Sequence, residues 1–280
     1  MDGTSLTRRN LLAAAMAAGV GAVLASPAIT RANAVANPEP AKDTMKPEYY
    51  ELRSYHLRRG PMQKRLDDYL RDAFIPAAAK AVGGPIGVFG VSIGMNNPTT
   101  HVLIPHASLE SFAALGGKLS TDADYAKSAE PFLAATPTEP GYESLDIKLM
   151  QAFPHMPRLE LPAATAKKEP RIFELRTYRS HGERAGAKKV EMFDTAGEIA
   201  IFRRCGLTPV FFASDLTGPG LPSLTYMLTF PDLATREKSW NTFRVDPEWK
   251  KLSSTPGFTD PEIVVGIDNQ VLSPTAYSQV

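Results

Sequence analysis

The chain contains a near-copy of itself, and this repeat constrains its fold more than any other feature does. The segment Tyr-Glu-Leu-Arg-Ser-Tyr at residues 50–55 returns 123 positions later as Phe-Glu-Leu-Arg-Thr-Tyr at residues 173–178. An acidic and aromatic segment at 121–125 is matched in the same way by 245–249, at an offset of 124. Because the offset drifts by one residue over about 75 positions, we interpret the chain as two copies of one architecture. The period is too long for a solenoid unit, so it predicts a tandem duplication of a small domain.

The first thirty-four residues have the features of an export signal. Arg8 and Arg9 precede a stretch at 10–30 that carries no charge and is rich in Ala, Gly, Val and Leu, and 32–34 form a small-x-small site, Ala-Asn-Ala. We expect residues 1–34 to be a cleaved twin-arginine (Tat-type) signal peptide of a bacterial protein that is periplasmic or secreted. A retained anchor is the alternative, but roughly 15 apolar residues fall short of the roughly 20 that span a bilayer. We therefore expect no stable membrane insertion after cleavage.

Composition excludes several classes of partner. The whole chain has 31 Lys and Arg against 30 Asp and Glu, and the first 34 residues hold three of the arginines and one aspartate. The mature chain is therefore nearly neutral, which argues against nucleic acid or an anionic membrane as partner. Cys205 is the single cysteine. No internal disulfide is expected, and the place of Cys205 at the end of an apolar helical pattern indicates a buried side chain.

The distribution of proline and polar residues predicts where the domains begin and end. Residues 35–47 are polar and interrupted by prolines, which is typical of a flexible leader. Residues 154–170 contain four prolines and form the expected linker between domains. The first domain is therefore expected at 48–153 and the second at 171–280.

The hydrophobic periodicity predicts the same order of elements, β-α-β-β-α-β, in both halves. In the first half we expect strands at 48–57, 86–93, 101–104 and 143–150, and helices at 65–81, 108–119 and 125–135. In the second half we expect strands at 171–178, 208–214, 224–230 and 262–272, and helices at 185–204, 232–243 and around Trp249.

This order is that of the ferredoxin-like fold, an α+β class. Its four-stranded antiparallel sheet carries both helices on one face, so the other face must be covered. Two tandem copies can cover each other sheet to sheet. We therefore predict an intramolecular dimeric α+β-barrel with a cavity between the two sheets.

The duplicated pattern resembles the NIPSNAP family, within the dimeric α+β-barrel superfamily. The matching segments are Glu-Leu-Arg-x-Tyr near the start of each half, 230–236, and Asp-Pro-Glu-Trp at 246–249. The first copy departs from the last motif, because 122–125 read Asp-Ala-Asp-Tyr. The resemblance implies the barrel fold over nearly the whole mature chain. It implies little about activity, since the family is poorly defined biochemically, although relatives of this architecture include cofactor-free monooxygenases and haem enzymes.

Strand alternation brings the polar residues of each Glu-Leu-Arg-x-Tyr motif to one face. The two sets are Glu51, Arg53 and Tyr55 in the first copy and Glu174, Arg176 and Tyr178 in the second. We expect the apolar alternates to pack on the helices, so that these six polar side chains, the candidate ligand-binding residues, face the cavity between the sheets. An arginine held by a glutamate can bind a carboxylate or enolate in two-point fashion, and a tyrosine beside it can donate a hydrogen bond or a proton. The alternative is that the charged pairs only satisfy each other across an interface.

Other motifs offer less chemistry. The histidines are too scattered for a metal site, and no nucleotide-binding or nucleophile-elbow motif occurs, so we expect no metal and no cofactor. Asp246, Pro247 and Trp249 are interpreted as structural, with Asp246 capping a helix, Pro247 at its first position and Trp249 packed inward.

Three hypotheses for function follow. The leading one is an exported protein that binds a small, partly apolar molecule between its two domains. The second is a cofactor-independent oxygenase or isomerase that acts on an activated aromatic or enolisable substrate. The third is a protein-interaction module without a ligand. The sequence is compatible with a homo-oligomer in each case.

Overall fold

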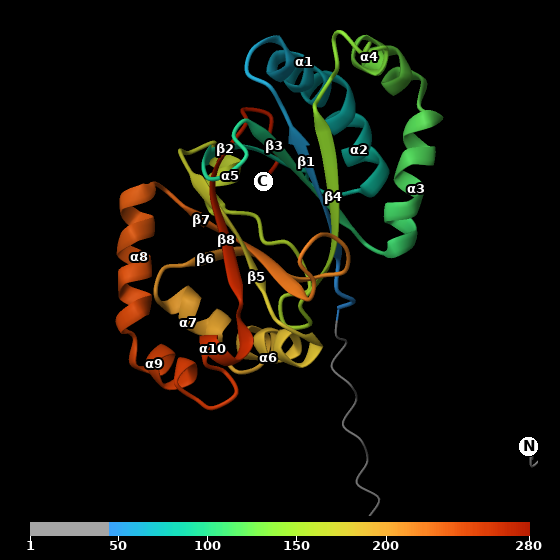
Figure 1. The fold of residues 1–280 in the computed structure, drawn as a ribbon. Coiled ribbons are helices and arrows are strands. Elements are labelled where there is room, and N and C mark those ends of the chain that lie inside the picture. Colours follow the sequence, from blue (N-terminus) through green and yellow to red (C-terminus); the bar gives the residue numbers. More distant parts are fainter. Residues whose placement is uncertain (1–44) are drawn as a thin grey trace, which may run out of the picture. The chain divides into compact units, whose positions relative to one another are not determined.

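The structure is a computed structural model that describes residues 45–280. The signal peptide predicted for 1–34 and nearly all of the predicted leader lie outside these residues. Within them, eight strands close into one barrel in the order β1-β3-β2-β8-β5-β7-β6-β4 (Figure 1). The first repeat supplies β1 to β4 and the second supplies β5 to β8. The predicted fold class, an α+β barrel built from tandem units, is confirmed.

The first repeat follows the predicted order of elements. They are β1 (Tyr49–His56), α1 (Pro61–Tyr69), the π-helical segment η1 (Leu70–Phe74), α2 (Ile75–Val82), β2 (Gly87–Ile93), β3 (Thr99–His106), α3 (Leu109–Ser120), α4 (Ala123–Leu133) and β4 (Ser144–Ala152). The single helix predicted for 65–81 is interrupted by this π-helical segment. Pro76 lies in the first turn of α2 directly after it, where a missing backbone N–H costs little.

The second repeat has the same order, preceded by a short linker helix, α5 (Ala163–Lys167). Its elements are β5 (Ile172–Arg179), α6 (Glu183–Asp194), α7 (Glu198–Arg204), β6 (Thr208–Asp215), β7 (Ser223–Phe230), α8 (Leu233–Val245), α9 (Pro247–Ser253), α10 (Asp260–Ile263) and β8 (Gly266–Pro274). The single helix predicted for 185–204 is wrong in one respect. It is divided into α6 and α7, because Gly197 adopts a φ of 102°, which a helix interior does not allow.

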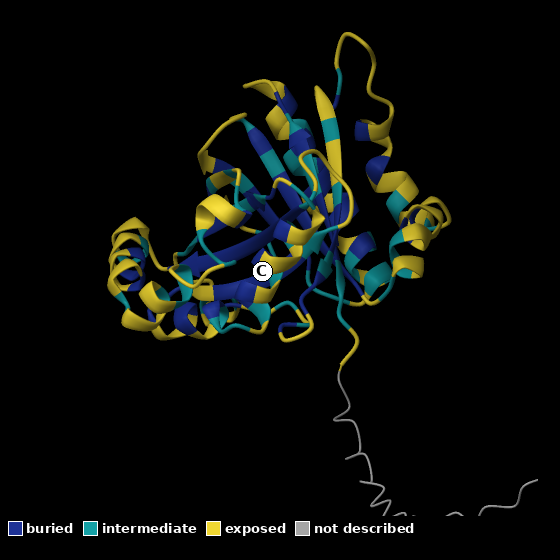
Figure 2. Cartoon of the chain, turned by 60° about the horizontal axis from the view of Figure 1, so that its bottom comes forward, coloured by how far each residue is buried: buried dark blue, intermediate teal, exposed yellow. Residues whose placement is uncertain are grey.

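Two strand pairs join the repeats into a closed barrel. Strand β2 pairs with β8, with Phe89 opposite Pro274, and β4 pairs with β6, with Ala152 opposite Ala213. Neither sheet is therefore left with an open edge at these seams. The helices of the first repeat lie outside β1 to β4, and α6 to α10 lie outside β5 to β8 (Figure 1). Figure 2 shows that buried residues concentrate along the strands while exposed residues lie on the outward faces of the helices.

The inside of the barrel is an apolar core shared by both repeats. Its large members are Tyr50, Leu52, Phe89, Leu103, Met150, Phe173, Leu175, Phe211, Met227 and Leu272. The rings of Tyr50 and Phe211 come from different repeats, and their centroids are 5.0 Å apart. Over this part of the barrel, side chains fill the space between the two sheets, where the sequence predicted a cavity.

The shared core predicts that Phe211→Ala will destabilise both repeats together. Phe211 is fully buried against the opposite sheet, and removing a buried phenyl ring typically costs about 3–5 kcal/mol. Urea unfolding should show this loss in one cooperative transition. Ile267→Ala, at a residue that is 42% exposed on β8, serves as the control and should change stability little. A loss below about 1 kcal/mol at Phe211 would contradict a packed interior.

Candidate functional site

The six predicted ligand-binding residues lie on the opposite face of the sheets from the one expected. Leu52 belongs to the shared core inside the barrel, whereas Tyr55 and Tyr178 belong to the cores that form between each sheet and its own helices. The expectation that the polar side chains face the other repeat is therefore wrong. Both faces of each sheet are buried here, so the polarity of a residue does not by itself indicate which face of the sheet it lies on. The apolar residues that alternate with these polar ones along β1 and β5 meet inside the barrel. The helices described lie outside it, so they supply no hydrogen-bond partner for a polar group at that place.

In the first repeat, Glu51 is the centre of a buried polar cluster. Its carboxylate accepts hydrogen bonds from Arg53 Nε at 2.6 Å and pairs with His106 Nε2 at 2.9 Å. The Arg53 guanidinium lies 4.8 Å from the centre of the Phe74 ring. Burial alone would raise the pKa of Glu51, but the bond to His106 and the charge of Arg53 hold that pKa below its ordinary value. Glu51 is therefore an ionised anchor for Arg53.

In the second repeat, Glu174 has a larger set of donors. Its carboxylate accepts from Arg176 Nη1 at 3.1 Å, from Arg236 Nε at 3.0 Å and from Trp240 Nε1 at 2.7 Å. Burial alone would raise the pKa of Glu174, but the bonds from Arg236 and Trp240 and the charge of Arg176 lower it. Arg176 also donates through Nη2 to the Tyr178 hydroxyl at 3.0 Å. Glu174 thus fixes two arginines from two elements, β5 and α8.

A second buried ion pair lies in the same layer. Lys189 on α6 is 1% exposed, and its Nζ lies 3.3 Å from Oε2 of Glu198, the first residue of α7. The Lys189 ammonium also lies 4.7 Å from the Phe193 ring centre and 5.1 Å from that of Tyr178. Burial raises the pKa of Glu198 to about 7, although Lys189 opposes the shift. An acid that titrates near neutrality beside a buried lysine is a feature of sites that move protons.

The two repeats differ around the Glu-Arg-Tyr triplet that they share. Around Tyr55 and Arg53 the first repeat places aromatic groups, with Tyr69 stacked on Phe132 and Tyr142 against Tyr55. Lys189 and Glu198 have no ion-paired counterpart in the corresponding layer of the first repeat within residues 45–280. The second repeat therefore holds the richer chemistry. We refer to its polar layer as the Arg176 site, which comprises Glu174, Arg176, Tyr178, Lys189, Glu198, Tyr226, Arg236 and Trp240.

A second polar cluster lies inside the barrel, at the end where β1 and β5 finish. Lys148 Nζ contacts Asp215 Oδ2 at 3.0 Å and Thr225 Oγ1 at 3.1 Å, which joins β4 of one repeat to β6 and β7 of the other. His101 pairs with Ser54 at 2.9 Å and with Gln270 at 2.8 Å, and burial lowers the pKa of His101 to about 4. These contacts join the repeats by neutral and charged hydrogen bonds at one end of the apolar core.

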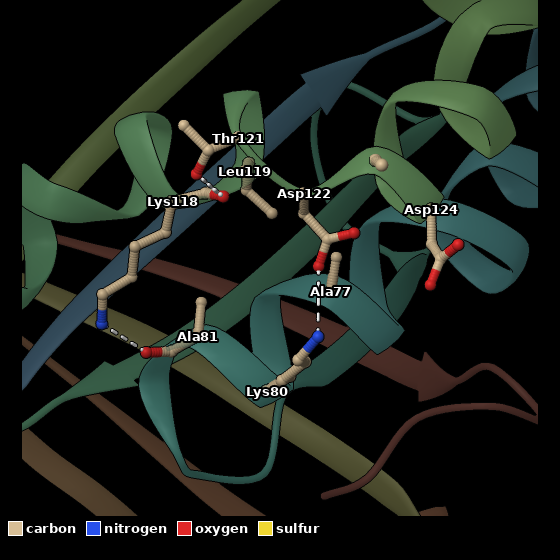
Figure 3. Close-up of a pocket in the computed structure, with 9 residues that line it drawn as sticks. Ala77, Lys80, Ala81, Lys118, Leu119, Thr121, Asp122 and Asp124 are labelled. Carbon is tan, nitrogen blue, oxygen red and sulfur yellow. Dashed lines mark hydrogen bonds and ion pairs between the residues drawn. The ribbon is translucent and has the colours of Figure 1, made fainter.

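Figure 3 shows a groove on the helical layer of the first repeat. Its volume is about 570 Å³, and it lies between α2 and the α3–α4 junction. Lys80 approaches Asp122 at 3.5 Å, and Lys118 donates to the Ala81 carbonyl at 2.8 Å (Figure 3). Both lysines and Asp124 are exposed. This groove is separate from both Glu-Arg-Tyr triplets and carries no buried acid or base.

Within residues 45–280, no three His, Cys, Asp or Glu side chains gather closely enough to hold a metal ion. None of the helices described there is both long and apolar enough to span a bilayer.

Asp246 and its neighbours make local contacts. The Asp246 side chain accepts from the backbone N–H of Glu248 and Trp249 at the start of α9, where Pro247 is the first residue. Asp246 also pairs with Arg204 on α7 at 2.8 Å. Trp249 packs against Phe243, with ring centres 4.3 Å apart. The motif ties α7, α8 and α9 together around the Arg176 site.

The sequence analysis missed several members of the Arg176 site. Arg236 and Trp240 are four residues apart on a helix and so share a face, a signal that could have been read. Lys189 and Glu198 gave no such signal. Lys189 interrupts an apolar helical face, and only the tertiary structure brings it to Glu198 across the α6–α7 break.

Sequence comparison identifies a family with this arrangement. The NIPSNAP family's sequence model matches residues 50–136 and 173–279, which are parts of both repeats. No curated protein matches the chain.

Among solved structures, a Lactobacillus acidophilus NCFM protein assigned provisionally as a monooxygenase is 6% identical, with a TM-score of 0.54, over 82% of this chain and 94% of that one. At this identity the likeness is one of fold alone. An uncharacterised NIPSNAP-like domain protein from Burkholderia xenovorans is 21% identical, with a TM-score of 0.35, over 39% of this chain and 88% of that one. A NIPSNAP family protein of unknown function from Agrobacterium tumefaciens strain C58 is 18% identical, with a TM-score of 0.35, over 39% of this chain and 93% of that one.

The raised pKa of Glu198 predicts a specific effect of pH on stability. Because the folded state raises this pKa from 4.5 to about 7, the stabilisation is complete below about pH 4.5 and is lost as the pH rises through about 7. The free energy of unfolding of the wild type should therefore fall, relative to Glu198→Gln, by up to about 3 kcal/mol over this range. Urea unfolding at several pH values measures the difference. Glu191→Gln, at an exposed residue of α6, is the control, and a pH-independent difference for Glu198→Gln would contradict the prediction.

Proposed function

Because the chain belongs to the NIPSNAP family, with matched segments in both repeats, we propose that it binds a small, partly aromatic molecule bearing an acidic oxygen. The binding site is the Arg176 site, between the sheet and the helices of the second repeat. The sequence suggested a small, partly apolar ligand in the space between the sheets; we place the ligand instead in the layer that the polar residues face.

The observation that carries the proposal is an unpaired N–H group on the Arg176 side chain. Its Nε is buried and has no hydrogen-bond acceptor among the described residues. A buried N–H without a partner costs about 1–3 kcal/mol. The guanidinium is held in place by Glu174 and by the Tyr178 hydroxyl, so a carboxylate or phenolate that reached it would meet an ordered donor.

The surroundings of Arg176 suit an aromatic body. The guanidinium lies 4.8 Å from the Trp240 ring centre, and Tyr178 stacks on Tyr226 with centres 5.7 Å apart. The side chains of Arg176 and Arg236 are 14% and 19% exposed, whereas Glu174 is fully buried. Entry is therefore expected past the two arginines, and it requires a small displacement of the groups that now fill this layer.

Glu198 favours catalysis as a second candidate function. A buried carboxyl group with a pKa of about 7 can accept a proton at neutral pH, and Tyr178 and Lys189 lie in the same layer. An enolisable or phenolic substrate held at Arg176 could lose a proton to Glu198. The provisional assignment of the Lactobacillus acidophilus relative as a monooxygenase adds cofactor-independent oxygenation to isomerisation as reactions to test.

We predict that 2-naphthoate binds the wild type and raises its melting temperature. Arg176→Gln should weaken this binding at least about tenfold, because it removes a charge-assisted bond worth about 1.5–3 kcal/mol. Isothermal titration calorimetry measures the affinity, with 2-naphthylmethanol as the uncharged probe.

Arg53→Gln, the equivalent change in the first repeat, is the matched control and should leave the affinity unchanged. Equal losses in the two variants, or no binding by the wild type, would contradict the proposed site. If the wild type converts an enolisable or phenolic substrate, loss of that turnover in Glu198→Gln with 2-naphthoate binding intact would assign a catalytic role to Glu198.

We also propose that the protein is exported through the twin-arginine pathway, on the basis of Arg8, Arg9 and the apolar stretch at 10–30. A reporter that is active only outside the cytoplasm, fused after residue 47, should be active in a bacterial host with a Tat translocase. Arg8→Lys together with Arg9→Lys should abolish that activity, and full activity of the double variant would contradict this route.

A further inference from the structure

Within residues 45–280, the Tyr178 hydroxyl receives two hydrogen bonds and gives none. Its oxygen accepts from Arg176 Nη2 at 3.0 Å and, more weakly, from the Tyr226 hydroxyl at 3.5 Å. Burial raises the pKa of Tyr226 well above its ordinary value, so Tyr226 keeps its proton and acts as a donor. A hydroxyl group has two lone pairs and one hydrogen. Because both lone pairs of Tyr178 are used, its hydrogen is available to a ligand.

Arg176 supplies a second available hydrogen close to the first. Its Nε is buried and has no acceptor among the described residues. Nε and Nη2 are bonded to the same guanidinium carbon, so Nε lies at most about 5.3 Å from the Tyr178 oxygen that Nη2 contacts. Two hydrogen bonds of about 2.9 Å each can span that distance. One ligand oxygen can therefore accept from Arg176 Nε and from the Tyr178 hydroxyl together.

The main acceptor beside these two donors is already occupied. Glu174 Oε1 accepts from Arg176 Nη1 and from Arg236 Nη2. Glu174 Oε2 accepts from Arg236 Nε and from Trp240 Nε1. A carboxylate offers about four acceptor positions, so Glu174 has none left for a hydrogen of the ligand. The arrangement therefore favours a ligand oxygen that carries no hydrogen.

The charges buried in this layer also favour an anion. Three cations and two acids lie in it, namely Arg176, Arg236, Lys189, Glu174 and Glu198. Burial raises the pKa of Glu198 to about 7, so this acid is only partly ionised near neutral pH. The neighbouring acids Glu237 and Asp260 are exposed, and solvent screens their charges. The buried cations therefore exceed the buried negative charges.

On the premise of the ligand site proposed above, we infer that the Arg176 site binds an aromatic hydroxyl compound as its phenolate, with Tyr178 as the residue that selects the ionised form. The phenolate oxygen accepts from Arg176 Nε and from the Tyr178 hydroxyl. The compound releases its proton to solvent as it binds. Two donors directed at one oxygen are the usual means of stabilising an oxyanion. Tyr226 strengthens the effect, because a hydroxyl that accepts hydrogen bonds becomes a better donor.

The visible absorption of 4-nitrophenol tests this inference, because its phenol and phenolate forms absorb at different wavelengths. Bound to the wild type, 4-nitrophenol should ionise at a lower pH than it does free in solution. The shift should correspond to phenolate binding at least about tenfold more tightly than the phenol. Tyr178→Phe should lose most of this preference, although it keeps the ring that stacks on Tyr226. Tyr226→Phe should reduce the preference by a smaller factor.

Tyr55→Phe, the equivalent change in the first repeat, is the matched control and should leave the phenolate preference unchanged. A wild type that binds 4-nitrophenol with its proton retained would overturn the inference. An equal phenolate preference in Tyr178→Phe and the wild type would do the same. If Tyr178→Phe does not fold, Tyr226→Phe decides, and an unchanged preference in that variant then overturns the inference.

The 2-naphthoate measurements separate failure of this inference from failure of the proposed function. If 2-naphthoate binds through Arg176 while Tyr178→Phe keeps the full phenolate preference, the ligand site stands and the role of Tyr178 is wrong. If neither 2-naphthoate nor 4-nitrophenol binds the wild type, the ligand site itself is wrong and the role of Tyr178 fails with it.

Discussion

The structure depends on the packing of two sheets against each other through their helix-free faces. Each repeat has a sheet whose inner face is apolar, and neither can remain exposed to water at that face. The β2–β8 and β4–β6 pairs close the barrel, and the rings of Tyr50, Phe89, Phe173 and Phe211 fill it. The duplication of the gene places the partner sheet on the same chain, so the barrel forms without a second molecule and its two halves can diverge.

Closure of the barrel decides where polar residues can be used. The interior is apolar over most of its length and polar at one end, where Lys148 and Asp215 join the two repeats. Other buried polar groups lie between each sheet and its helices, a layer that helices supply with additional donors. Glu174 illustrates this arrangement, because Arg176 comes from the sheet while Arg236 and Trp240 come from α8. The same glutamate in the first repeat is satisfied by Arg53 and His106, and both come from strands.

The divergence of the repeats gives the second one its chemistry. The first repeat keeps the Glu-Arg-Tyr triplet but surrounds it with aromatic packing. The second keeps the triplet and adds the buried Lys189–Glu198 pair, which is costly to bury without a compensating role. A duplicated fold can keep one copy for stability while the other carries function, and the contrast between these two polar layers is consistent with that division.

The sequence alone determined the duplication, the α+β class, the order of the elements and the polar triplets, because these depend on local periodicity and on the self-match at 50–55 and 173–178. It could not determine the direction in which the triplets point. Alternation separates two faces of a strand, but when both faces are buried, only the packing of whole sheets decides which face meets the helices. The division of α6 from α7 and the meeting of Lys189 with Glu198 were likewise decided by tertiary structure, since each depends on backbone geometry that no local pattern encodes.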